Sequence, residues 1–155
     1  MVMGLALYFA YGSNLSRAQM LARCPGATAS GTAMLTGFRL AFAGHSEGWG
    51  GAVATVWPES AASVPGRLYH LTDADWKALD RIEGCPHRYQ REVAMVTDGE
   101  GAQRRAHLYV KHDLVPATPT AAYVDVIRKG YLGLGFDIKG LERALAEAGA
   151  DIKKG

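Results

Sequence analysis

Glu83 is a carboxylate that the spacing of its neighbours turns toward the interior of the protein. A helix is predicted to open at Thr72 and to run to Glu83, with its apolar positions at Trp76, Leu79 and Ile82. Glu83 lies seven residues after Trp76 and four after Leu79, so it shares their face. Burial and the negative end of the helix dipole both penalise a charged carboxylate, so both should raise its pKa. Such a group is suited to general base and acid catalysis near neutral pH.

An ordinary structural role for Glu83 stays open at this point. Near a frayed helix end, the side chain can extend into solvent and form an ion pair with Arg81 or Arg88. Helix spacing alone does not separate this alternative from the catalytic one.

The turn Tyr11-Gly12-Ser13-Asn14 is the second feature with chemical potential. It separates an apolar run over residues 5–10 from a helical pattern over residues 15–22. A strand that turns at a glycine into a helix presents unpaired backbone N–H groups, which bind carboxylates, phosphates or developing oxyanions. The turn has neither of the glycine patterns of nucleotide sites. An ordinary helix cap, in which Ser13, Asn14 or Ser16 accepts hydrogen bonds from the start of the helix, is the alternative.

The rest of the pattern predicts the elements that position these residues. Strands are expected over residues 5–10, 29–34, 38–43, 52–57 and 66–71, followed by a hairpin of 89–96 and 103–110. Helices are expected over 15–22, over 72–83 with Gly84 as its end, from near Pro119, and over 138–148. Strands with helices inserted and appended are typical of an α+β fold with a mainly antiparallel or barrel-like sheet.

Length and composition favour one globular domain over residues 1–155. Apolar residues make up 48% and charged residues 21% of the chain, which argues against disordered and fibrous proteins. The net charge of +2 is too balanced for a nucleic-acid-binding protein. The apolar N-terminal segment is too short to span a bilayer and has no basic residue ahead of it, so we expect a cytoplasmic protein without membrane contact.

The two cysteines, Cys24 and Cys85, match no metal or redox spacing. Two free thiols are the simpler expectation, and a single disulfide is the alternative. The five histidines show no ligand spacing, so no metal site is expected.

Taken together, these residues resemble the gamma-glutamylcyclotransferase family, including its plant AIG2-like and bacterial BtrG-like members. Residues 7–15 (LYFAYGSNL) are similar to the signature loop of the family, and residues 49–55 (WGGAVAT) to one of its strand entries. Residues 66–69 (GRLY), with Leu79-Asp80, Glu83-Gly84, Tyr89 and Arg91, resemble a further block, and Pro119 and Tyr123 fit a later region more loosely. The matches run from about residue 7 to residue 133.

The resemblance implies a fold, a reaction and a set of site residues. The fold is α+β, a small mixed, mainly antiparallel β-barrel with flanking helices. In the reaction, the α-amine of a γ-glutamyl group attacks its own γ-carbonyl, which yields 5-oxoproline and a free amine without water, metal or organic cofactor. Glu83 matches the base of the family, and the backbone amides of Gly12 and Ser13 would hold a carboxylate or oxyanion. The implied substrate-binding residues are Tyr8, Phe9, Ala10, Tyr11, Gly12, Ser13, Tyr89 and Tyr123.

The implied partner is a small γ-glutamyl molecule. Whether it is a γ-glutamyl amino acid, a γ-glutamylamine or a carrier-bound product is not separated by the sequence. His87 and Arg88 could contact an acidic substrate tail, although solvation is the interpretation we favour. A homodimer is an open alternative by analogy, and a non-catalytic ligand- or protein-binding module on the same fold is the alternative function.

Overall fold

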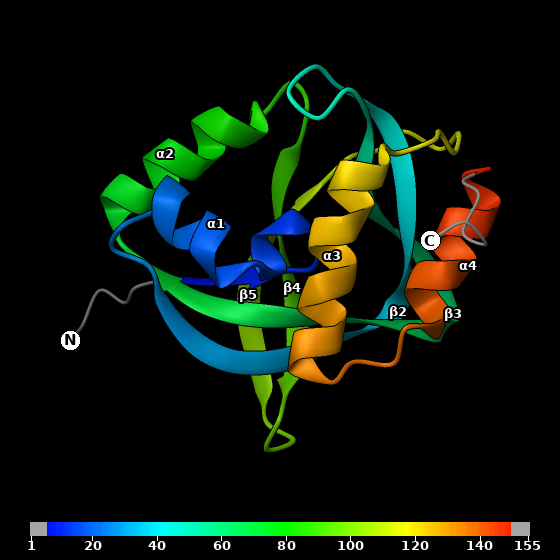
Figure 1. Cartoon of the computed structure of the whole chain (residues 1–155). Helices are drawn as coiled ribbons and strands as arrows, with labels where there is room; N and C mark the ends of the chain where they lie inside the picture. The colour runs from blue at the N-terminus through cyan, green and yellow to red at the C-terminus, as the bar shows by residue number, and fades with distance from the viewer. Residues whose placement is uncertain (1–5, 150–155) are drawn as a thin grey trace.

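The computed structural model describes residues 6–149, which form a closed β-barrel with helices packed around it (Figure 1). The strands are β1 (Ala6–Ala10), β2 (Thr28–Ser46), β3 (Gly51–Leu71), β4 (Gln90–Asp98) and β5 (Gln103–Val110). Their order around the barrel is β1-β3-β2-β4-β5, and β1 closes the barrel by pairing with β5. The β1–β5 pairing is parallel and the others are antiparallel, which confirms the expected mixed, mainly antiparallel barrel.

The helices lie outside the barrel. A short 3-10 helix, η1 (Ser13–Leu15), is followed by α1 (Arg17–Arg23), α2 (Asp73–Glu83), α3 (Ala121–Leu134) and α4 (Lys139–Glu147). In Figure 1, α1 and α2 lie to the left of α3, and α4 lies to its right. Within residues 6–149, no helix combines the length and the apolarity needed to cross a bilayer.

The prediction of four short strands between residues 29 and 71 is wrong, because β2 and β3 are two long, bent strands. Gly37 has a φ of 89° and lies at a shift in the β2–β3 register, so this glycine forms a bulge rather than a turn. Pro58 and Pro65 both lie within β3 and do not end it. Bulges bend a strand without ending it, and this bending lets one hairpin wrap around the barrel.

Helix α2 begins and ends where the sequence predicts. The Thr72 side chain accepts a hydrogen bond from the Asp75 N–H at 3.1 Å, and the Asp75 carboxylate accepts one from the Thr72 N–H at 3.2 Å. This capping box fixes the start of the helix. Gly84 ends it in the left-handed conformation, with a φ of 68°. Glu83 is therefore held in the last turn of a helix that is fixed at both ends.

The expected helix over residues 15–22 is divided at Ser16. Its hydroxyl caps α1 by accepting a hydrogen bond from the Gln19 N–H at 3.2 Å. Of the cap candidates in this region, Ser16 takes that role, and the side chains of Ser13 and Asn14 remain available for other contacts.

Strand β1 separates two apolar cores. Phe9 faces the barrel interior together with Phe42 and Leu68, whereas Tyr8 and Ala10 face the layer beneath α2. Successive side chains of a strand point to opposite faces, so this alternation follows from the strand itself. Tyr8 and Phe9, although adjacent, therefore lie in different environments.

Candidate active site

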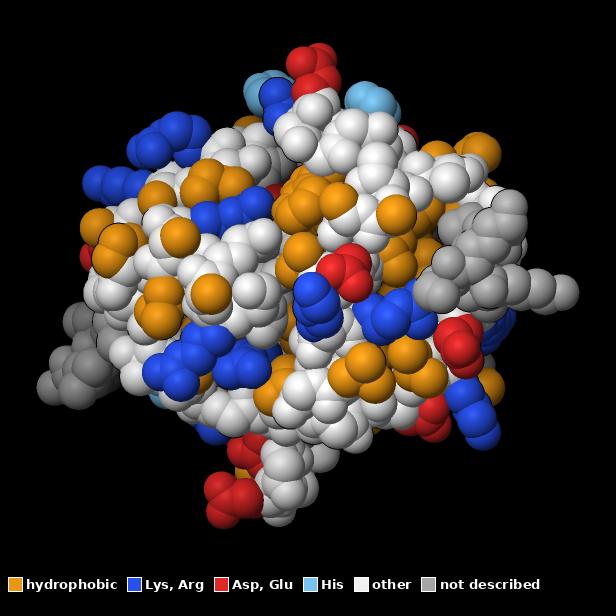
Figure 2. Space-filling model, in the orientation of Figure 1, with side chains coloured by type: hydrophobic (Ala, Val, Ile, Leu, Met, Phe, Trp, Pro, Cys, Tyr) orange, Lys and Arg blue, Asp and Glu red, His pale blue; other side chains and the backbone are white. Residues whose placement is uncertain are grey.

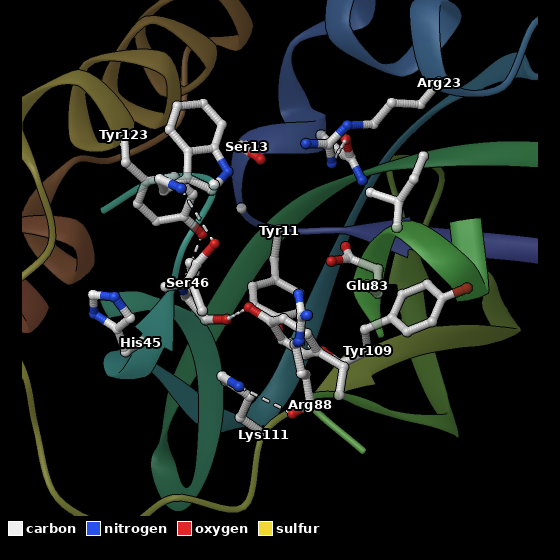
Figure 3. Close-up of a pocket in the computed structure, with 18 of the residues that line it drawn as sticks. Tyr11, Ser13, Arg23, His45, Ser46, Glu83, Arg88, Tyr109, Lys111 and Tyr123 are labelled. Atoms are coloured by element: carbon white, nitrogen blue, oxygen red, sulfur yellow. Dashed lines mark hydrogen bonds between the residues drawn. The ribbon is translucent and has the colours of Figure 1, made fainter. Parts of the chain in front are cut away.

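A cavity of about 240 Å³ lies where η1, the end of α2, the β2–β3 turn, the end of β5 and the start of α3 meet (Figure 3). Seven of the residues predicted for the site line it: Tyr8, Tyr11, Gly12, Ser13, Glu83, Tyr89 and Tyr123. The other two, Phe9 and Ala10, are buried in the two cores and do not line it. Figure 2 shows hydrophobic side chains gathered beside the hollow between α2 and α3, with a basic side chain at its edge.

Glu83 points its carboxylate into this cavity from the last turn of α2 (Figure 3). The residue is half-buried, and burial raises its pKa from 4.5 to about 7, against the opposing effect of the nearby positive charges of Arg23 and Lys111. Among residues 6–149, none forms an ion pair or a hydrogen bond with this carboxylate, Arg81 and Arg88 included. The alternative of a solvent-exposed ion pair at the helix end is therefore wrong, and the carboxyl group is free to exchange a proton with a ligand.

The α2 face that carries Glu83 is only partly as the sequence predicts. Trp76 and Leu79 are buried, as expected. Ile82, predicted as a core position, is 40% exposed because it lies at the cavity, which it lines beside Glu83. The helix thus presents one apolar and one ionisable side chain to the same opening.

Gly12 forms the N-cap of η1 and allows close packing at the cavity wall. A Cβ atom at this position would lie 3.3 Å from the Ala54 Cβ and 3.5 Å from the Tyr123 hydroxyl oxygen. Because glycine has no side chain, this N-cap residue cannot accept a hydrogen bond from the first N–H groups of η1. Gly12, Ser13 and Asn14 all line the cavity, so this turn can serve as an anion-binding wall.

Asn14 joins the turn to helix α1 and to Tyr8. Its Nδ2 donates to the Tyr8 hydroxyl at 3.0 Å, and its Oδ1 accepts from Gln19 Nε2 at 3.0 Å and from Arg23 at 3.2 Å. Gln19 also donates to the Ser13 hydroxyl at 2.7 Å. Sequence reasoning missed Gln19 and Arg23, although their spacing of four residues places both on one face of α1.

Tyr89 and Tyr123 both bind the peptide groups of Ala54 in β3. The Tyr89 hydroxyl donates to the Ala54 carbonyl at 2.7 Å, and the Tyr123 hydroxyl accepts from the Ala54 N–H at 2.8 Å. Tyr123, which the family resemblance implies as a substrate-binding residue, is only 3% exposed, so it packs in the core and also lines the cavity. Within residues 6–149 the proton of its hydroxyl has no acceptor, so Tyr123 can donate a hydrogen bond into the cavity.

The cavity tyrosines remain neutral donors. Burial is the main cause that raises the pKa of Tyr8, Tyr11, Tyr89 and Tyr123 above 10. Tyr11 donates its proton to the Tyr109 carbonyl oxygen. The Tyr8 hydroxyl accepts from Asn14, and its own proton has no acceptor in the described part of the chain, so it too can be donated to a ligand.

Basic side chains line the cavity as well. Arg23, Arg88 and Lys111 face it, whereas His87, which is exposed, does not line it. No local pattern marks Lys111 as a site residue, because it joins the site only when β5 completes the barrel.

Both cysteines are free thiols. Cys24 is buried, with its sulfur 3.5 Å from the Asp75 carbonyl oxygen, and burial raises its pKa to about 11. Neither cysteine lines the cavity, so neither enters its chemistry.

Known proteins match both the sequence and this geometry. The family model described as gamma-glutamyl cyclotransferase, AIG2-like, matches residues 8–130. A human gamma-glutamylcyclotransferase is 30% identical over 146 residues, which cover 90% of this chain and 77% of the human protein. The mouse gamma-glutamylcyclotransferase is 30% identical over 129 residues, covering 80% of this chain and 69% of its own.

Solved structures agree. A structure described as gamma-glutamyl cyclotransferase superposes with a TM-score of 0.80 at 26% identity, covering 94% of this chain and 88% of the other. An AIG2-like protein from Mus musculus superposes with a TM-score of 0.59 at 22% identity, covering 78% and 83% of the two chains, and shares the fold. The family resemblance and the barrel expected from the sequence are thus confirmed, and the chain belongs to the gamma-glutamyl cyclotransferase, AIG2-like family.

Proposed function

We propose that this protein cyclises a γ-glutamyl amide to 5-oxoproline and releases an amino acid or amine. The observation that carries the proposal is Glu83: an ionisable carboxyl with a pKa of about 7 that faces the same cavity as the Gly12–Ser13 turn. Two gamma-glutamylcyclotransferases at 30% identity support the same reaction class.

The reaction is an intramolecular aminolysis. The α-amine nitrogen of the glutamyl group forms a bond to its own γ-carbonyl carbon, and the bond from that carbon to the leaving nitrogen breaks. Because the nucleophile belongs to the substrate, much of the rate enhancement comes from holding the chain in a folded conformation. A walled cavity of about 240 Å³ is suited to that task.

Glu83 would carry the proton between the two nitrogens. The attacking amine must lose a proton as the ring closes, and the leaving nitrogen must gain one as its bond breaks. A carboxyl group with a pKa of about 7 can accept the first proton and return it in the second step, so no proton is gained or lost overall. Its lack of an ion-pair partner within residues 6–149 keeps it available for both transfers.

Developing negative charge on the γ-carbonyl oxygen needs donors that are already in place. The N–H groups of Gly12 and Ser13 and the hydroxyl protons of Tyr8 and Tyr123 are neutral donors that line this cavity. Neutral tyrosines suit this role because their raised pKa values keep them protonated throughout the reaction. The same donors can bind the α-carboxylate of the substrate.

The direct test incubates the wild type and Glu83→Gln with a panel of γ-glutamyl amides in H₂¹⁸O. The wild type should release 5-oxoproline and amine in equal amounts, without ¹⁸O in the product, because water takes no part. Glu83→Gln should react roughly 10²–10⁴-fold more slowly while keeping its circular dichroism spectrum. Full activity in that variant would remove Glu83 from the mechanism, and ¹⁸O-labelled glutamate as product would indicate hydrolysis instead. Ligand binding without turnover in the wild type would favour the non-catalytic module.

The proposed subcellular location is the cytoplasm, where Cys24 and Cys85 would stay reduced. Their free state in the fold supports this part of the proposal. Fluorescence microscopy of a tagged chain tests it.

A further inference from the structure

Lys111 is a buried lysine at the rim of the cavity. It directly follows β5, and only 7% of the residue is exposed. The Thr55 hydroxyl fixes its backbone on both sides, because it accepts from the Lys111 N–H and donates to the Lys111 carbonyl, each at 2.9 Å. The side chain therefore starts from a rigid base and reaches a cavity that it lines.

The ammonium group has fewer partners than its charge and donors require. Its Nζ donates to the Arg88 carbonyl oxygen at 3.0 Å and lies 4.9 Å from the centre of the Tyr89 ring. An ammonium has three donors, and a buried charge is costly unless an opposite charge offsets it. Asp113 approaches the Lys111 side chain near Gly44, yet within residues 6–149 no carboxylate lies within 4.0 Å of the Lys111 Nζ. A site for an anion thus remains beside this group.

The charged side chains of the cavity wall also favour an anionic ligand. Arg23, Arg88 and Lys111 line it, and in the described part of the chain none of them forms an ion pair. Among the described residues that line the cavity, Glu83 is the only one with a carboxylate. Figure 3 shows Arg23 on one side of the cavity and Lys111, next to Arg88, on the other, with Glu83 between them in the view. A ligand with one anionic group at each end would match this distribution.

We infer that Lys111 binds a carboxylate on the leaving group, so that the preferred substrates are γ-glutamyl α-amino acids rather than γ-glutamylamines. This inference rests on the proposed function. A γ-glutamyl amino acid carries two carboxylates, one on the glutamyl part and one on the amino acid that is released. The first would lie near the Gly12–Ser13 turn and Arg23, and the second would meet the Lys111 ammonium across the cavity. A γ-glutamylamine lacks the second carboxylate and would leave Lys111 unpaired.

The competing role for Lys111 is structural, because it also holds the Arg88 carbonyl and packs on Tyr89. The two roles differ in what they do to matched substrates. A structural lysine would affect the turnover of all substrates by the same factor. A lysine that binds the leaving group would affect only those that carry the anion.

The test compares γ-glutamyl-L-alanine with γ-glutamyl-L-alaninamide, which replaces the carboxylate by a neutral amide of nearly the same size. The ratio of their kcat/KM values is measured for the wild type and for Lys111→Met. Comparing this ratio between proteins cancels the different intrinsic reactivities of the two substrates. A charge-assisted hydrogen bond predicts that the ratio falls by about 10- to 100-fold in Lys111→Met. An unchanged ratio overturns the inference, even if both rates decline.

Lys77→Met is the matched control. Lys77 lies on α2 but is exposed and does not line the cavity, so the same change of charge there should leave the substrate ratio at its wild-type value. A fall in this ratio as large as in Lys111→Met would attribute the effect to net charge and overturn the inference.

A binding measurement separates this inference from the proposed function and needs no change at Lys111. Isothermal titration calorimetry on Glu83→Gln should give at least a roughly tenfold tighter Kd for γ-glutamyl-L-alanine than for γ-glutamyl-L-alaninamide. If the wild type forms no 5-oxoproline while this preference holds, the proposed function fails and the anion site stands. If 5-oxoproline forms and the two ligands bind equally, the function stands and the anion site fails. If neither ligand binds and the wild type forms no 5-oxoproline, both the proposed function and the anion site are overturned.

Discussion

Tyr89 and Tyr123 form hydrogen bonds to the two backbone polar groups of Ala54. The Tyr89 hydroxyl donates to the Ala54 carbonyl at 2.7 Å, and the Tyr123 hydroxyl accepts from the Ala54 N–H at 2.8 Å. This pair fixes β3 at the cavity wall and also sets the direction of each hydroxyl proton. The Tyr89 proton is used by the protein, whereas the Tyr123 proton is available to a ligand. Two residues of the same type in the same cavity therefore have different roles.

Tyr123→Phe should lower both stability and activity. The buried Ala54 N–H loses its acceptor, which should reduce the free energy of unfolding by about 1–3 kcal/mol. The cavity also loses a donor, so kcat/KM should fall by at least roughly tenfold. Urea denaturation and steady-state kinetics measure the two effects. Tyr131→Phe is the control, because the Tyr131 hydroxyl makes no hydrogen bond within residues 6–149 and does not line the cavity. Equal losses in both variants would contradict a special role for Tyr123.

The rate should depend on pH through Glu83. The carboxylate form is the base, so kcat/KM should rise with pH below about 7 and approach a plateau above it. Burial sets this value, and the positive charge of Lys111 lowers it. Lys111→Met should therefore shift the rising limb to higher pH. A pH–rate profile of γ-glutamyl-L-alaninamide cyclisation measures both, and a limb that stays in place would contradict this coupling.

Glu83 should destabilise the fold at alkaline pH. Its pKa is about 7 in the folded protein and near 4.5 in the unfolded chain, so between these values the folded state holds a proton that the unfolded state lacks. Stability from this group is thus present at low pH and lost as pH rises through 7. Glutamine cannot titrate, so Glu83→Gln should be more stable than the wild type by on the order of 1 kcal/mol at pH 8, allowing for solvent at this half-buried group, and show little gain at pH 5.

Thermal unfolding of both proteins at pH 5 and pH 8 tests this sign. A gain of equal size at the two pH values would mean that Glu83 does not titrate between them.

Gly12→Ala should narrow the cavity. The new methyl group would lie 3.3 Å from the Ala54 Cβ and 3.5 Å from the Tyr123 hydroxyl oxygen, so one wall must shift. We expect kcat/KM to fall by at least roughly tenfold, as misplacement of the reacting groups is costly. Gly133→Ala in α3 is the control: its Cβ would meet nothing within 4 Å, and alanine should stabilise the helix by about 0.5–1 kcal/mol without loss of activity. Normal kinetics in Gly12→Ala would contradict the close packing of this turn against the substrate.

Local signals made helix α2 predictable. Thr72 and Gly84 mark its ends by side-chain and backbone conformations that depend on nearby residues alone. The position of Glu83 on its inner face follows from helix geometry. The family resemblance implied both Tyr8 and Phe9 as substrate-binding residues, but the alternation of side chains along a strand allows only one of them. Because they are neighbours on β1, they point to opposite faces, and only one can face the cavity.

The other features of the fold and of the site depend on contacts between residues far apart in the sequence, so local patterns did not predict them. A glycine such as Gly37 suits a turn or a bulge equally, and the choice depends on the partner strand, which the local sequence does not specify. Arg23 and Lys111 are far apart in the chain and meet Glu83 only through the closure of the barrel. Their place at the cavity therefore depends on the tertiary fold and not on any local pattern.

The barrel closes where β1 meets β5, at the pairing of Tyr8 with His107. Tyr8 also lines the cavity, so any fluctuation that separates these two strands dismantles the binding pocket as well. A bound molecule must then oppose that separation, by simple mass action. Occupancy should accordingly slow amide hydrogen exchange around Tyr8 and His107 more than at the tip of the β4–β5 hairpin, which projects away from the β2–β3 turn in Figure 1. The rate of amide exchange at the β1–β5 pairing should therefore report whether the pocket is occupied.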